Sequence, residues 1–103
     1  MLVTVALAFV AGFMIGNGLP YYLEGSAGRG ANPSPFPDSP HAAVAVGTIA
    51  IAVGATCAWL ADIPARPVAG GVAFGLGWLA VGMIHAGNWT GDPWRKRART
   101  TEP

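Results

Sequence analysis

The feature that most constrains this chain is its last apolar run, Pro67 to Ala86, which contains no charged residue and is followed by the basic segment 95–99. About twenty such residues form a helix long enough to cross a bilayer. Cations just beyond a span keep that end in the cytoplasm. We therefore predict a final membrane span at about residues 67–87 and a cytoplasmic tail, 95–103. The tail residues that we expect to set the topology and to contact lipid headgroups are Arg95, Lys96, Arg97 and Arg99.

Composition places the whole chain in the membrane class. Of its 103 residues 52% are hydrophobic and 11% charged, and the mean hydropathy is +0.45. A chain of this length forms one domain. The net charge is only +1, and the clustered cations indicate membrane orientation rather than a nucleic-acid surface. We therefore expect the lipid bilayer as a partner and no nucleic acid.

Two earlier apolar runs predict two further spans, at about residues 1–19 and 41–60. A signal peptide is the alternative for the first, but no Lys or Arg precedes the run and no clear cleavage site follows it. Between them, the Pro- and Gly-rich segment 25–40 predicts a loop. Asp38 and Ser39 are candidate N-caps for the second span. The fold class is therefore all-α, a bundle of three membrane helices. The short connector 62–67 predicts that spans two and three are antiparallel neighbours.

Three crossings and a cytoplasmic tail place the N-terminus outside. This threading puts every Lys and Arg except Arg66 on the cytoplasmic side.

Each span carries small residues at helical spacing, which is how membrane helices approach one another closely. We expect these residues to pack the helices within one chain, or alternatively to join a second copy or a larger complex. The predicted packing positions are Ala8, Gly12 and Gly16 in the first span, Gly47 and Gly54 in the second, and Gly71, Gly75 and Gly82 in the third.

Candidates for chemistry are few. Asn17, His41 and His85 fall at the same membrane face in this threading, and ionisable groups at such depths are often functional. We expect no metal site and no cofactor, although a proton or ligand role for the two histidines stays open. The only cysteine, Cys57, lies within a span, and the pattern contains no catalytic constellation, so we predict a protein that is not an enzyme.

One stretch carries a resemblance. The run 16–22, Gly-Asn-Gly-Leu-Pro-Tyr-Tyr, precedes Pro33-Ser34-Pro35-Phe36 and then Asp38-Ser39-Pro40. This pattern resembles a family of small uncharacterised bacterial membrane proteins with a Gly-Asn-x-x-Pro turn, a Pro-Phe loop and two further spans. In that family a histidine commonly follows the Pro, where this chain has Tyr21, so a role for that histidine does not transfer. The resemblance implies three spans and no particular activity.

Together these patterns predict a non-enzymatic protein of the bacterial inner membrane, an accessory or structural subunit of a larger complex or a homo-oligomer. One alternative is a holin of phage type that permeabilises the membrane. The other is a small transporter or ligand-binding bundle, which would need a polar pocket shared by Asn17, His41 and His85.

Overall fold

The computed structural model describes residues 1–29 and 39–91, and of 88–91 only the backbone. This part of the chain forms α1 (Leu2–Ser26), α2 (Pro40–Ala61), the short 3-10 helix η1 (Ile63–Ala65) and α3 (Pro67–Gly91), with no strand. Three segments are long and apolar enough to cross a membrane: Leu2–Ser26, Pro40–Ala65 and Pro67–Gly87. At 1.5 Å per residue even α2, the shortest of the three long helices, spans about 33 Å, slightly more than the hydrocarbon core of a bilayer. The predicted all-α bundle of three apolar helices is therefore confirmed.

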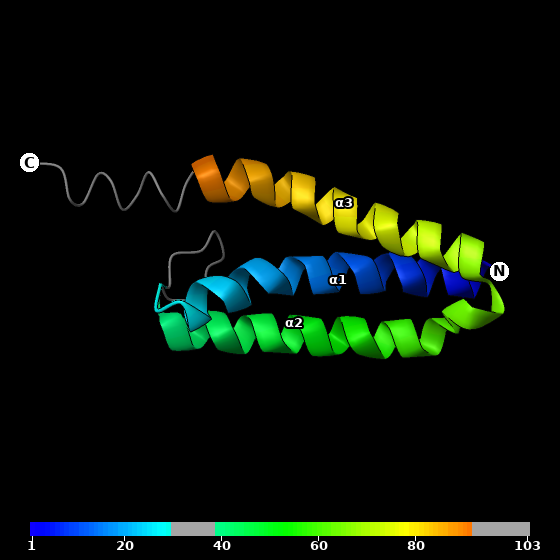
Figure 1. Ribbon diagram of the computed structural model, residues 1–103, viewed down its shortest axis with the longest axis horizontal. Coiled ribbons are helices and arrows are strands. Elements are labelled where there is room, and N and C mark those ends of the chain that lie inside the picture. Colours follow the sequence, from blue (N-terminus) through cyan, green and yellow to red (C-terminus); the bar gives the residue numbers. More distant parts are fainter. Residues whose placement is uncertain (30–38, 92–103) are drawn as a thin grey trace, which may run out of the picture.

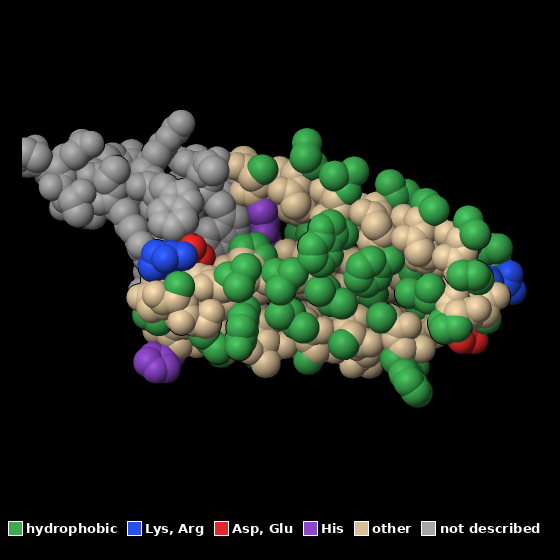
Figure 2. Space-filling view, viewed as in Figure 1, with side chains coloured by type: hydrophobic (Ala, Val, Ile, Leu, Met, Phe, Trp, Pro, Cys, Tyr) green, Lys and Arg blue, Asp and Glu red, His purple; other side chains and the backbone are tan. Residues whose placement is uncertain are grey.

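Charged side chains keep to the ends of this bundle. In the described segments they are Glu24 and Arg29 at one end, and Asp62 and Arg66 in the connector at the other. Figure 2 shows the same division on one face, with hydrophobic side chains between the two charged ends. This distribution suits a bundle whose middle lies in hydrocarbon.

Helix α1 is longer than the sequence pattern predicts, because it does not stop before Pro20 but continues to Ser26. Proline inside a helix removes the hydrogen bond to the carbonyl four residues earlier, here that of Gly16. Packing of the last turns compensates, since Tyr21 is buried and Gly25 lies against Pro40 and Val44 of α2. The segment 20–26, which lies beyond the predicted first span, is therefore part of the helix.

Helix α2 begins as predicted from its cap. The hydroxyl of Ser39 accepts a hydrogen bond from the backbone N–H of Ala42 at 3.4 Å, and Pro40 occupies the first turn, where it costs no hydrogen bond. The helix ends at Ala61 because Asp62 adopts a left-handed conformation, with φ of 51°. The connector then folds into η1 and reverses the chain into α3.

The order of the helices differs from the prediction. Helix α1 lies between α2 and α3 and contacts both (Figure 1), whereas the described parts of α2 and α3 scarcely touch. Spans two and three are antiparallel but not packed neighbours, so that expectation is wrong. The reason is that α1 carries small residues on two faces, and each flanking helix takes one of them.

Candidate functional site

The contact between α1 and α2 is a close approach of backbones. A Cβ placed on Gly47 would lie 2.6 Å from the amide nitrogen of Tyr22 and 2.7 Å from the carbonyl oxygen of Gly18. One placed on Gly54 would lie 2.9 Å from the carbonyl oxygen of Ala11. Together with buried Ala43 and Ala50, the two predicted α2 glycines form one continuous seam. Sequence periodicity therefore identified the α2 seam correctly.

The contact between α1 and α3 also depends on glycine. A side chain on Gly12 would overlap the backbone carbonyl of Phe74, and one on Gly77 would overlap that of Phe9. We call these two positions the glycine crossing. One turn further, a Cβ on Gly16 would meet Val81. Ala8, which is completely buried, packs with Ala73 near the η1 end. The predicted small positions of α1 therefore all lie at helix contacts.

The predicted small residues of α3 lie elsewhere. Among the described residues, no atom lies within 4 Å of a Cβ added at Gly71, Gly75 or Gly82, so these three do not pack α3 against α1 or α2, and the expectation of packing within one chain is wrong for them. The seam that α3 presents to the bundle is made instead by Gly70, Ala73, Gly77 and Val81, all of which are buried. We call Gly71, Gly75 and Gly82 the outer glycine face. At 100° per residue it lies roughly 135° around the helix from the buried seam.

A polar cluster joins α1 to α3 near the end of the bundle that holds Ser26. His85 and Asn17 are hydrogen-bonded at 2.9 Å between Nε2 and Oδ1. Because an amide oxygen can only accept, Nε2 of His85 carries the proton. Buried Tyr21, one turn along α1 from Asn17, lies edge-on to the imidazole with ring centroids 6.0 Å apart. Two of the three candidate residues from the sequence, Asn17 and His85, therefore meet.

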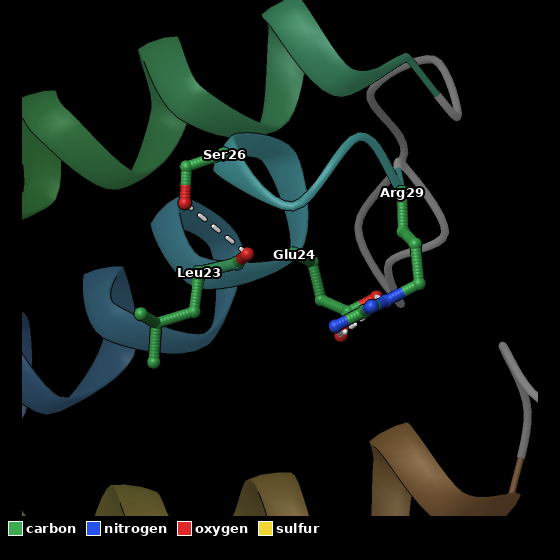
Figure 3. Close-up of polar contacts among 4 residues, drawn as sticks. All are labelled: Leu23, Glu24, Ser26 and Arg29. Carbon is green, nitrogen blue, oxygen red and sulfur yellow. Dashed lines mark hydrogen bonds and ion pairs between the residues drawn. The ribbon is translucent and has the colours of Figure 1, made fainter.

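An ion pair lies beside this cluster. The guanidinium of Arg29 donates from Nε and Nη2 to the carboxylate of Glu24, with a shortest distance of 3.0 Å (Figure 3). This hydrogen bond, and then the charge of Glu24, raise the pKa of Arg29 above its ordinary value. The side chain of Glu24 is only 12% exposed. A carboxylate at the negative end of a helix dipole is unfavourable and is stabilised by a cation. The sequence alone does not pair Arg29 with Glu24.

The turn after α1 explains how the pair forms. Gly28 has φ of +83°, and the N–H groups of Gly28 and Arg29 bond back to the carbonyls of Gly25 and Glu24. This is the Schellman arrangement, which requires a residue in the left-handed conformation and brings the residue after it beside the last turns of the helix. Glycine at position 28 and the cation one residue later were the sequence signals for the pair.

His41 is not part of the polar cluster. It is exposed and lines a groove between α1 and the start of α2, with Gly25, Ser26, Gly28, Pro40 and Val44. Two other grooves on the described surface lie along Leu19, Tyr22, Thr48, Ile51 and Ala52 and around Ala58, Trp59, Asp62 and Pro64, and neither Asn17 nor His85 lines any of the three. The polar pocket expected for a ligand-binding bundle is therefore not formed by these three residues. Within the described part of the chain no group of three His, Cys, Asp or Glu could hold a metal ion.

Some predicted features lie outside the described residues. The tail cations Arg95, Lys96, Arg97 and Arg99 belong to this group, as does the middle of the Pro-rich loop, 30–38.

Fold and contacts together define a class: a small helical bundle of three candidate membrane spans, packed through glycine, with polar groups at its ends. Comparison with protein-family models, with curated proteins and with solved structures gave no match. The resemblance carried by residues 16–40 stays an expectation from the sequence.

Proposed function

We propose that the protein is a structural, non-enzymatic subunit of a membrane assembly, and that it joins another membrane helix through the outer glycine face of α3. The observation that carries this proposal is that no atom of the described residues approaches Gly71, Gly75 or Gly82, in contrast to the tight contacts at Gly12, Gly47 and Gly77.

The physical argument concerns what glycine contributes to a membrane helix. Lipid tails are as apolar as leucine, so a lipid-facing position gains nothing from a missing side chain. A glycine in a helix costs about 1 kcal/mol relative to alanine. Three glycines on one face recover that cost when a second backbone approaches closely, as it does at the other seams of this bundle.

The neighbouring side chains favour the same use of this face. Val68, Val72, Leu79 and Met83 are each more than half exposed within the single chain. In lipid these exposures cost little, so they do not demand a partner, but they form an apolar ridge along one side of the glycines, against which a helix can pack.

Replacement of Gly75 by leucine is expected to weaken this association at least tenfold, because the new side chain holds the two backbones apart. The measurement is the mass of the detergent-solubilised protein by light scattering, together with identification of membrane proteins that co-purify from the native membrane. Ala55→Leu, the same kind of change at an exposed position of α2, is the control and is expected to leave the assembly intact. A parent protein that is monomeric and has no co-purifying membrane protein would refute the proposal, as would an assembly that Gly75→Leu leaves unchanged.

The orientation we propose is N-terminus outside and C-terminus in the cytoplasm of a bacterial inner membrane. A fluorescent protein fused after Pro103 is expected to fold and fluoresce, and alkaline phosphatase inserted in the connector after Arg66 is expected to be active, since the phosphatase matures only outside. Replacement of the four tail cations by asparagine is expected to weaken this bias. The opposite pattern in the two reporters would reverse the proposed topology.

The alternative functions gain no support from the described geometry. A transporter needs a polar path, but the glycine crossing closes α1 against α3 directly beyond the polar cluster. Because no described feature favours a permeabilising protein, we retain the structural role.

A further inference from the structure

The contact between α1 and α3 changes in character along its length. In the middle, the two backbones touch through the glycine crossing, and toward the η1 end buried Ala8 packs with Ala73. Toward the C-terminal end of α3 the two ribbons diverge (Figure 1), and the contacts there are made by side chains, Asn17 with His85 and Tyr21 with the same imidazole. By contrast, α2 stays close to α1 as far as Gly25, whose added Cβ would meet Pro40 and Val44.

We propose that this contact is a hinge with a latch. Helix α3 pivots at the glycine crossing, and the hydrogen bond from His85 to Asn17 holds its C-terminal half closed against α1. A hinge needs a fixed contact and a contact that can open. On α3 the two are separated here by about two turns, from Gly77 to His85.

The strength of the latch suits two populated states. Hydrogen bonds between membrane helices shift an equilibrium only about three- to twentyfold. Loss of one such bond would therefore change the open population without unfolding the bundle. The glycine crossing does not open by small steps, because two backbones in direct contact lose their close packing as soon as the helices move apart.

The position of the latch indicates what opening exposes. Asn17, Tyr21 and Glu24 follow one another at spacings of four and three, so they share one face of α1. In the closed state α3 lies against that face through His85. The open state presents the side-chain amide of Asn17 and the phenol group of Tyr21, whose hydroxyl can hydrogen-bond, at the end of the bundle.

The test measures two distances in one protein. In a Cys57→Ala background, spin labels at Leu23 and Gly87 report the latch end, and labels at Ala6 and Val72 report the end beyond the crossing. All four positions are exposed. Pulsed electron paramagnetic resonance in liposomes gives the distance distribution of each pair.

His85→Ala and Asn17→Ala are each expected to raise the population of long Leu23–Gly87 distances about three- to twentyfold, with the Ala6–Val72 distance unchanged. His85→Gln, whose amide can still donate to Asn17, is expected to restore the closed distribution. The proposal is overturned if the latch pair is unchanged in both alanine variants, or if both pairs broaden together, since the contact then opens as one unit. It is also overturned if His85→Gln behaves like His85→Ala, because the hydrogen bond is then not what holds the helix.

Discussion

Gly77→Leu is expected to abolish the native bundle, whereas Gly75→Leu, two residues away on the same helix, is expected to leave a single chain folded. A side chain at Gly77 overlaps the backbone carbonyl of Phe9, and only movement of a whole helix relieves that overlap. At Gly75 an added Cβ meets no atom of the described segments within 4 Å. We expect Gly77→Leu to lower the free energy of unfolding by about 3 kcal/mol or more, the upper end of overpacking costs.

The measurement is the midpoint of thermal unfolding in a mild detergent, followed by circular dichroism and by the elution profile on size exclusion. Gly75→Leu is the matched control, since both variants add the same side chain to the same helix. Equal midpoints for Gly77→Leu and the parent would show that α3 does not pack on α1 in this register. Equal losses in both variants would show that the two faces of α3 are packed alike.

A second large effect is expected at Gly47, where α2 meets α1. Leucine there must displace the backbone of Tyr22 and Gly18, both within 2.7 Å of an added Cβ. Because α2 contacts α1 and scarcely touches α3, it has no second helix to hold it in place. We expect a loss of about 3 kcal/mol or more in the free energy of unfolding and separation of α2 from α1.

The separation is measured by pulsed electron paramagnetic resonance between spin labels at Leu23 of α1 and Thr48 of α2, both exposed, in a Cys57→Ala background. The distance distribution is expected to be narrow in the parent and to shift to longer distances in Gly47→Leu. Ala45→Leu, at an exposed position two residues earlier, is the control that should keep the parent distribution. An unchanged distribution in Gly47→Leu would contradict the seam described here.

Gly47→Leu and Gly75→Leu together distinguish the folding of one chain from its association with a second helix. Gly47→Leu acts on the bundle itself, while Gly75→Leu acts only where a second helix is proposed to lie. Loss of assembly in Gly75→Leu with an unchanged unfolding midpoint would distinguish a docking face from a folding defect.

Comparison of the predicted and observed helix seams shows where sequence periodicity is sufficient. The two glycines of helix α2, Gly47 and Gly54, fall on one face, so they indicate a single seam, and the prediction holds. Helix α3 has two rows, one through Gly70 and Gly77 and one through Gly71 and Gly75. Both rows have helical spacing, and periodicity gives no reason to choose between them. The structure buries the first, so the predicted row is not the one that packs α3 within the bundle.

Helix ends show a similar division. The start of α2 follows from local chemistry, because Ser39 can bond only to the first turn of a helix that begins beside it. The continuation of α1 through Pro20 does not, because proline locally favours an end. It is stabilised by contacts of Tyr21 and Gly25 with other helices, which no local pattern contains.

The sequence by itself determined that this chain forms three long apolar helices and that its charged residues lie near their ends, since hydrophobic runs and prolines act within a few residues of the chain. Only the tertiary structure decided that α1 is the central helix, that Asn17 meets His85, and which glycines of α3 stay open. Those outcomes depend on how one helix surface fits another. The hydrogen bond between Asn17 and His85, for example, joins residues 68 positions apart in the sequence. Complementarity of that kind belongs to pairs of surfaces rather than to any single segment.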